Sequence, residues 1–183
     1  MTASRPRIPY TYDDYRTLPE DMSRRYELLH GELYMVPAPT TLHQRILRRL
    51  LVVFDRHVAA HRLGEVLLSP VDVILGQGDA REVAQPDLVF IAQARRDIVK
   101  LHAIEGAPDL AIEILSPGTE ERDRGYKRTL YARHGVKEYW IVDPQTRTVE
   151  VHAMIGEPRV YTDEQSLATP LLPGLTLILR EIF

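Results

Sequence analysis

The short stretch over residues 109–115 (DLAIEIL) constrains the fold most, because it is apolar on both faces. A strand of this kind is buried on both sides and needs a covering layer above and below it. A helical pattern follows over residues 119–134, and a second apolar stretch (EYWIV) follows over residues 138–142. Strand, helix and strand in this order predict a parallel pair joined by a crossover helix.

The remaining patterns supply more strands and two more helices. We expect helices over residues 11–20, capped by Thr11, and 41–63, capped by Thr40 or Thr41 and ending near Gly64. A hairpin over residues 26–36 turns at His30-Gly31. Further strands are expected over residues 66–75, 86–91 and 149–155 and within 171–183. The economical arrangement is an α/β (α+β) domain, residues 1–183, in which a mixed sheet is flanked by helices.

Composition limits the class of protein. The chain has 183 residues and no cysteine, which excludes a disulfide framework and a thiolate metal site. The first ten residues lack the apolar core of a signal peptide, and no apolar run approaches the roughly 18 residues of a membrane span. We therefore expect a cytoplasmic protein without membrane contact. Because the formal net charge is -3, any nucleic acid must be bound by a local basic patch or with a metal ion that offsets the carboxylates.

Two acidic residues lie in or beside apolar strands. Glu113 is in the middle of the stretch at 109–115, where a lone ionised carboxylate would be unfavourable by several kcal/mol unless a cation balanced it. Asp87 opens the apolar stretch PDLVFI on a strand that we expect to be its neighbour. The pair predicts a site for a hard cation such as Mg²⁺, which prefers oxygen ligands. Two alternatives stay open: Glu113 pairs with a structural arginine or reaches solvent, and Asp87 only shapes the turn before its strand.

Lys127 lies in the crossover helix that follows the strand of Glu113. It shares a helical face with Asp123, Leu130 and Tyr131, at spacings of three and four residues. Since Leu130 and Tyr131 are expected to face the sheet, this face directs the ammonium toward the strand end. Two acids, a metal ion and a lysine suit phosphodiester hydrolysis, in which the lysine stabilises the transition state. The alternative is a lysine whose stem packs while its charged head reaches water.

At this point the chain resembles a known family, the Uma-two family of predicted restriction endonucleases, a branch of the PD-(D/E)XK nuclease superfamily. The resemblance spans roughly residues 26–152 and is carried by RYELLHGELYMVPAP with LHQRI, LLSPVDVIL, QPDLVFI, APDLAIEILSPGT, RDRGYKRTLYARHGVKEYWIVDP and TRTVEVH. It implies a restriction-endonuclease-like fold and cleavage of DNA that depends on Mg²⁺ or Mn²⁺.

The resemblance also implies roles for single residues. Asp87 falls on the motif aspartate and Glu113 on the acidic position of the (D/E)XK element, which makes this pair the metal ligands. Leu115 stands where the superfamily has lysine, and Lys127 matches a lysine displaced onto the following helix. The family positions that look like supporting site residues are occupied by Glu27 and His43, which could instead be a cross-strand partner and a surface or capping residue.

The sequence leaves three functions open. The first is a DNA endonuclease, for which a homodimer would let two sites cut two strands. The second is a non-catalytic nucleic-acid-binding or interaction module on the same fold, which Leu115 and the acidic net charge favour. The third is a metal-dependent phosphohydrolase of RNA or of small phosphate esters.

Asp72, in the apolar VDVIL, is either a further site residue or satisfied by a neighbour. Candidate phosphate contacts are the arginines of the long helix and the basic run Arg122, Arg124, Lys127, Arg128, Arg133 and Lys137.

Overall fold

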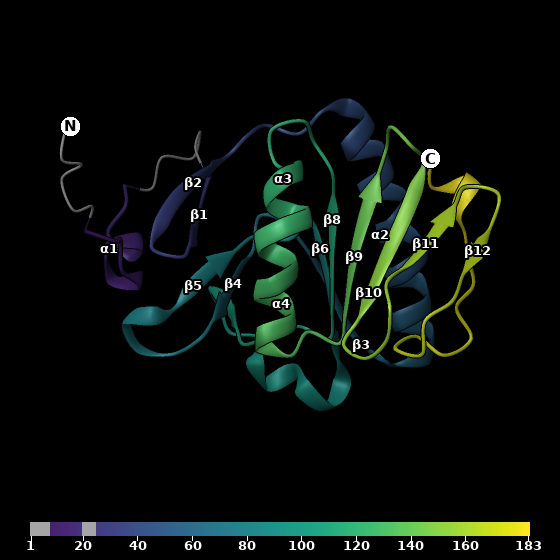
Figure 1. Ribbon diagram of the computed structural model, residues 1–183. Helices are drawn as coiled ribbons and strands as arrows, with labels where there is room; N and C mark the ends of the chain where they lie inside the picture. The colour runs from purple at the N-terminus through teal and green to yellow at the C-terminus, as the bar shows by residue number, and fades with distance from the viewer. Residues whose placement is uncertain (1–7, 20–24) are drawn as a thin grey trace.

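The structure is a computed structural model that describes residues 8–19 and 25–183 (Figure 1). In these residues the strands form a five-stranded mixed sheet in the order β2-β1-β5-β4-β7, a six-stranded mixed sheet in the order β11-β10-β9-β8-β6-β3, and a small pair, β12-β13. The mixed α/β class expected from the sequence is confirmed, but the strands are divided between two larger sheets where one was expected.

The elements have the following bounds. The strands are β1 (Arg25–Leu29), β2 (Glu32–Val36), β3 (Gly64–Leu68), β4 (Asp72–Leu75), β5 (Glu82–Ala84), β6 (Leu88–Ala92), β7 (Ala103–Glu105), β8 (Leu110–Ile114), β9 (Glu138–Asp143), β10 (Thr148–Ala153), β11 (Arg159–Thr162), β12 (Ser166–Leu167) and β13 (Leu177–Ile178). The α-helices are α1 (Tyr12–Arg16), α2 (Thr41–His61), α3 (Glu120–Arg122) and α4 (Arg128–His134). The short 3₁₀ turns are Gly78–Ala80, Gln93–Ile98 and Leu179–Glu181.

The expected parallel pair at the centre of the six-stranded sheet is confirmed. β8 runs parallel to β9, with Glu113 aligned with Ile141, and the helical segment between them crosses one face of the sheet (Figure 1). On its other side β8 pairs antiparallel with β6, with Leu88 opposite Ile112. Asp87 directly precedes β6, so this register brings Asp87 and Glu113 to the same end of two neighbouring strands.

The helical segment after β8 is not one regular helix. It begins as α3, widens into a π-helix over Asp123–Lys127 and ends as α4, where Gly135 adopts the left-handed conformation with a φ of 83°. The expected helix over residues 119–134 is thus present, and Gly135 ends it as expected, but its middle turn is wider than an α-helical one. π-helical turns occur frequently at functional sites, and this one contains Asp123 and Lys127.

The prediction of a single strand over residues 66–75 is wrong. β3 and β4 occupy this stretch and belong to different sheets. Ser69, Pro70 and Val71 separate them, and Pro70 has no N–H to donate to a strand ladder. The periodicity also fails to predict β5, β7, β11 and β12, because two to four residues show too few alternations.

The first two helices also end earlier than the patterns predict. α1 is capped by Thr11 as expected but spans only Tyr12–Arg16, and residue 20 of the expected span lies outside the described residues. α2 starts after Thr40 and ends at His61, with Arg62 rather than Gly64 as its left-handed cap. Gly64 has a different use: in β3 a Cβ at this position would lie 2.0 Å from the carbonyl oxygen of Ile91. The glycine therefore permits a close approach of two strands.

Two helical layers cover the six-stranded sheet (Figure 1). α2 packs on one face through Ile46, Leu50 and Phe54, and the ring of Phe54 meets that of Trp140 edge-on at 5.7 Å. α4 covers the other face with the buried ring of Tyr131. Across the described ranges, no helix is long and apolar enough to cross a membrane.

Candidate active site

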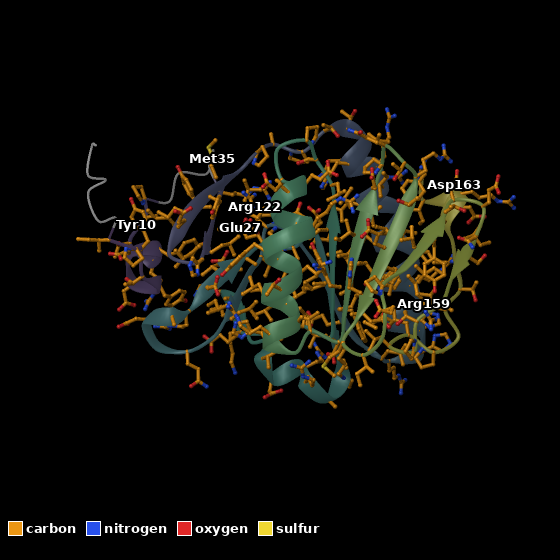
Figure 2. The ribbon with its side chains drawn as sticks, in the orientation of Figure 1. Tyr10, Glu27, Met35, Arg122, Arg159 and Asp163 are labelled. Atoms are coloured by element: carbon orange, nitrogen blue, oxygen red, sulfur yellow. The ribbon has the colours of Figure 1, made fainter. Side chains whose placement is uncertain are left out.

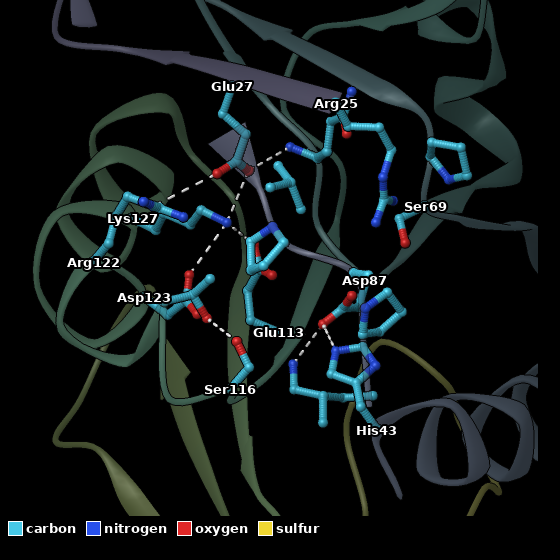
Figure 3. Close-up of a pocket in the computed structure, with 18 of the residues that line it drawn as sticks. Arg25, Glu27, His43, Ser69, Asp87, Glu113, Ser116, Arg122, Asp123 and Lys127 are labelled. Carbon is cyan, nitrogen blue, oxygen red and sulfur yellow. Dashed lines mark hydrogen bonds and ion pairs between the residues drawn. The ribbon is translucent and has the colours of Figure 1, made fainter. Parts of the chain in front are cut away.

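A pocket of about 280 Å³ lies where β1, the start of α2, the ends of β6 and β8 and the segment after β8 meet (Figure 3). Its charged or titratable lining residues are Arg25, Glu27, His43, Asp87, Glu113, Arg122, Asp123 and Lys127. Four carboxylates therefore face three permanent cations and one histidine. The pocket is rich in acid, and an added cation would be bound more favourably than an added anion.

Asp87 is held at the start of β6 by two groups that contact the same oxygen. The backbone N–H of Ile114 donates to Oδ2 of Asp87 at 2.8 Å, and Nε2 of His43 lies 3.0 Å from that oxygen. His43 is itself positioned because Thr40 caps the first turn of α2 and accepts the His43 N–H. Both contacts to Asp87 use Oδ2, so its Oδ1 has no hydrogen-bond partner among the described residues.

Glu113 is buried in β8 with one oxygen engaged. Its Oε1 accepts hydrogen bonds from Nζ of Lys127 at 2.8 Å and from the hydroxyl of Tyr131 at 3.1 Å. No partner contacts Oε2 within the described part of the chain. Burial raises the pKa of Glu113 well above its ordinary value; the Lys127 charge opposes this shift, and nearby carboxylates, Asp87 among them, add to it. The carboxyl group therefore has less positive charge around it than full ionisation would favour.

Lys127 is buried between three carboxylates (Figure 3). Its Nζ lies 2.8 Å from Oε1 of Glu113, 2.9 Å from Oε1 of Glu27 and 3.2 Å from Oδ1 of Asp123. The contact with Glu113 is also a hydrogen bond, and the contacts with Glu27 and Asp123 are ion pairs. Burial alone would lower the pKa of Lys127, but the three negative charges outweigh it and raise the pKa well above the ordinary value. Lys127 is therefore charged at neutral pH.

Glu27 brings the five-stranded sheet into the site. It lies in β1, and its Oε1 accepts the Gln85 N–H at 2.8 Å in addition to its contact with Lys127. Its Oε2 is 3.6 Å from Nε of Arg122, an ion pair too long for a hydrogen bond. Glu27 is almost fully buried. Through Lys127 it is connected to Glu113, so charged residues of the two sheets form one group at the pocket.

The unpartnered oxygens allow a test of whether a divalent cation fits. Asp87, directly before β6, and Glu113, in the neighbouring strand β8, line the same pocket. Mg²⁺ is usually bound by one or two protein carboxylates, with water and phosphate oxygens completing its coordination. Within residues 8–19 and 25–183 no group of three or more histidine, aspartate or glutamate side chains could hold a metal. The residues present therefore fit an open two-carboxylate site but not a closed cage of protein ligands.

The structure brings together every side chain that the sequence predicts for the site. One pocket is lined by Asp87, Glu113, Lys127, Glu27 and His43. Asp72 is not part of it, because its carboxylate accepts hydrogen bonds from the Tyr15 hydroxyl at 3.0 Å and from the Gln85 side chain at 2.8 Å. Leu115, at the position of the superfamily lysine, is buried in the apolar core.

Three further residues of the site have partners that the sequence patterns do not show. Asp123 contacts Lys127. The sequence signal for this contact is that Asp123 lies four residues before Lys127 on the same helical face. Tyr131 was interpreted as a sheet-facing residue, and its hydroxyl donates to Glu113. Arg122 lies in the basic run of the helix, and no local pattern distinguishes it from its exposed neighbours.

The fold and the pocket define a class of protein: an α/β domain of restriction-endonuclease-like architecture with an acidic pocket at the strand ends. The family described as "Uma2: Putative restriction endonuclease" matches residues 12–180. The chain belongs to this family.

Known proteins are similar to this chain over most of its length. The crystal structure of "a putative nuclease belonging to DUF820" from Anabaena variabilis superposes with a TM-score of 0.81 at 25% sequence identity, over 96% of this chain and 98% of that one. An uncharacterized protein of Synechocystis is 26% identical over 156 residues, which cover 83% of this chain and 80% of the relative. The family and the fold expected from the sequence are both confirmed.

Proposed function

We propose that the protein is a metal-dependent endonuclease that hydrolyses phosphodiester bonds of DNA. The observation that carries the proposal is the meeting of Asp87 and Glu113 in one pocket, each with one oxygen held and the other without a partner among the described residues. The description of the family and of the Anabaena relative supports the class of reaction. Mg²⁺, or Mn²⁺ in its place, is the cation that suits oxygen ligands in an open site.

Asp87 and Glu113 would hold the cation. A bound divalent ion supplies a Lewis acid for the phosphoryl oxygen and lowers the pKa of water. The contacts of Ile114 and His43 to Oδ2 of Asp87 restrict that carboxylate to one orientation. Lys127 holds Oε1 of Glu113 and places a permanent positive charge beside the position where the transition state gains negative charge.

A nicking assay with supercoiled DNA and Mg²⁺ or Mn²⁺ tests the proposal. We expect Asp87→Asn and Glu113→Gln to lower the nicking rate by at least about 100-fold, because each removes a charged oxygen from the cation site. Asp163→Asn is the matched control, since Asp163 pairs with Arg147 at 2.6 Å and lies at the opposite end of the molecule from Glu27 (Figure 2). It should nick DNA at the wild-type rate.

Three outcomes would contradict the proposal. Equal nicking by all four proteins would assign the activity to a contaminant. Calorimetric titration with MnCl₂ that detects no binding to the wild-type protein would remove the metal dependence. Faster cleavage of RNA or of a small phosphodiester than of DNA would show that the substrate is wrong. Nicking by Lys127→Ala at the wild-type rate would leave the cation site intact but remove the role proposed for the lysine.

A further inference from the structure

The engagement of Lys127 raises the question of which group contacts the substrate phosphate. Its ammonium is buried and lies within 3.2 Å of the carboxylates of Glu113, Glu27 and Asp123, so its charge is already shared among three anions. We propose that Arg122 binds a phosphate of the nucleic acid backbone and positions it in the pocket. This inference rests on the proposed phosphodiester chemistry and names the residue that orients its substrate.

Arg122 has hydrogen-bond donors that the described residues leave unused. It ends α3 and lines the pocket, with only 15% of its side chain exposed. Its Nε and Nη2 are buried without a hydrogen-bond partner in the described part of the chain, and the carboxylate of Glu27 is 3.6 Å from Nε. These two nitrogens have lost their hydration without replacing it. A ligand with several acceptor oxygens would remove this deficit.

The surroundings of Arg122 favour a ligand group that offers two acceptor oxygens side by side. Its Cζ lies 4.8 Å from the ring centroid of Tyr34, so the aromatic face supports one side of the guanidinium. The remaining nitrogen, Nη1, is not among the buried atoms that lack a partner, and it makes no hydrogen bond to a described residue. The open edge of the fork thus lies at Nη1. Two oxygens of a phosphate match the geometry of a guanidinium fork, which a lysine ammonium cannot reproduce.

The charges of the pocket also need a cation that is free to contact the substrate. Four carboxylates line it, and a backbone phosphate that enters would be repelled by them. Arg122 lies beside Lys127 and Glu27, whereas Arg25 lies across the pocket near Ser69 (Figure 3). Arg122 is therefore the guanidinium next to the charged group that includes Glu113, and Arg25 serves as a comparison in the same pocket.

Fluorescence anisotropy with a labelled DNA duplex in EDTA tests the proposal without cleavage. We expect Arg122→Met to weaken binding by about tenfold at low salt. The slope of log affinity against log salt concentration should decrease in magnitude by about one, because one phosphate contact is lost. The affinity of Arg122→Lys should lie between those of wild type and Arg122→Met, because lysine keeps the positive charge but lacks the two-pronged geometry of a guanidinium. Arg159→Met, in the exposed strand β11 at the far end of the molecule, is the control and should bind as wild type (Figure 2).

A thermal melt separates this role from a purely structural one. If Arg122 serves only to balance Glu27, Arg122→Met will lower the melting temperature and leave the affinity and the salt slope unchanged, which overturns the proposal. If Arg122 binds phosphate, the free variant should melt close to wild type, and added duplex should stabilise it less than it stabilises wild type. Wild-type affinity in Arg122→Lys would overturn the bidentate contact, and a loss confined to Arg25→Met would assign the phosphate to Arg25.

The binding assay and the nicking assay fail independently. Binding that depends on Arg122 without nicking that depends on Glu113 would remove the endonuclease proposal and retain the phosphate contact. If nicking depends on Glu113 but Arg122→Met binds DNA as wild type does, the endonuclease proposal is retained and the phosphate contact of Arg122 is removed. If the wild-type protein binds no duplex at low salt, the phosphate contact is overturned.

Discussion

Asp109 and Glu113 lie near opposite ends of β8, and both are buried, but only Asp109 has cations of its own. It accepts the Ala92 N–H at 2.8 Å and lies 2.7 Å from Nζ of Lys137 and 3.2 Å from Nη1 of Arg95. Burial alone would raise the pKa of Asp109, but the backbone N–H and the two cations together lower it below the ordinary value. This carboxylate joins β8 to its neighbours and has no deficit of positive charge.

Glu113 has the opposite balance. It shares the single charge of Lys127 with Glu27 and Asp123, and its pKa is raised. The difference teaches that burial of an acid does not by itself indicate a functional site. An acid with two cations and a backbone donor is part of the framework, whereas an acid short of positive charge can accept another cation.

The largest expected effect comes from removing the shared cation. Lys127→Met would leave Glu113 and Asp123 buried without a partner of opposite charge among the described residues, and Glu27 with Arg122 alone, so we expect a loss of about 3–5 kcal/mol in the free energy of unfolding. Urea denaturation at pH 7 measures it. Adding Glu113→Gln to this variant should restore part of the loss, because it removes one of the stranded charges. A Lys127→Met protein as stable as wild type would show that the three acids do not depend on this lysine.

A smaller effect, with a defined pH dependence, is expected for Asp109→Asn. Its lowered pKa means that the ionised carboxylate stabilises the fold above the pKa of the unfolded chain, and that this stabilisation is lost as the pH falls through the folded pKa. We expect the variant to be about 2 kcal/mol less stable than wild type at pH 7, with a difference that shrinks in acid. Urea denaturation at several pH values measures both.

Glu113→Gln sharpens the comparison because its pH trend should be opposite. The raised pKa of Glu113 means that the folded protein holds this proton more tightly than the unfolded chain. Wild-type stability should therefore fall as the pH rises from the unfolded pKa toward the raised one, and Glu113→Gln should gain relative to wild type over that window. Parallel trends for Asp109→Asn and Glu113→Gln would remove the distinction between the two ends of β8.

The smallest effect is expected for Tyr131→Phe. This change removes the hydroxyl that donates to Oε1 of Glu113 at 3.1 Å, so we expect a loss of about 1 kcal/mol in stability and a reduction of Mn²⁺ affinity by up to about tenfold. Tyr139→Phe is the matched control, because its hydroxyl donates to the carbonyl oxygen of Asp123 at 3.0 Å. Calorimetry should show weaker Mn²⁺ binding for Tyr131→Phe only. Equal binding by both variants and wild type would contradict a positioning role for Tyr131.

The central part of the fold could be predicted because its signals lie in consecutive residues. The doubly apolar β8, the helical segment and β9 follow one another along the chain, and Gly135 ends the helix where the pattern indicates. The division into two sheets could not be predicted in this way. β5 has three residues and is defined by its pairing with β1 and β4, which lie elsewhere in the sequence.

The residue types of the candidate site could likewise be predicted from the sequence, whereas their individual contacts could not. Asp87, Glu113 and Lys127 stand out because charged residues are unusual beside or within apolar strands and on a sheet-facing helical surface, and those surroundings are local. Whether an individual nitrogen or oxygen is engaged or idle depends on distant segments. The idle donors of Arg122 are one example, because they follow from its distance to Glu27 in β1.

The order of strand, helix and strand, and the presence of ionisable residues in apolar surroundings, are thus written in the chain, because hydrophobic period and residue type are properties of neighbouring positions. The state of each carboxylate oxygen follows from folding. Oδ2 of Asp87 is held by groups from α2 and β8, and Oε1 of Glu113 by groups from the segment before α4 and from α4 itself. Hydrogen bonds and ion pairs act over a few ångströms in space, whatever the separation in sequence.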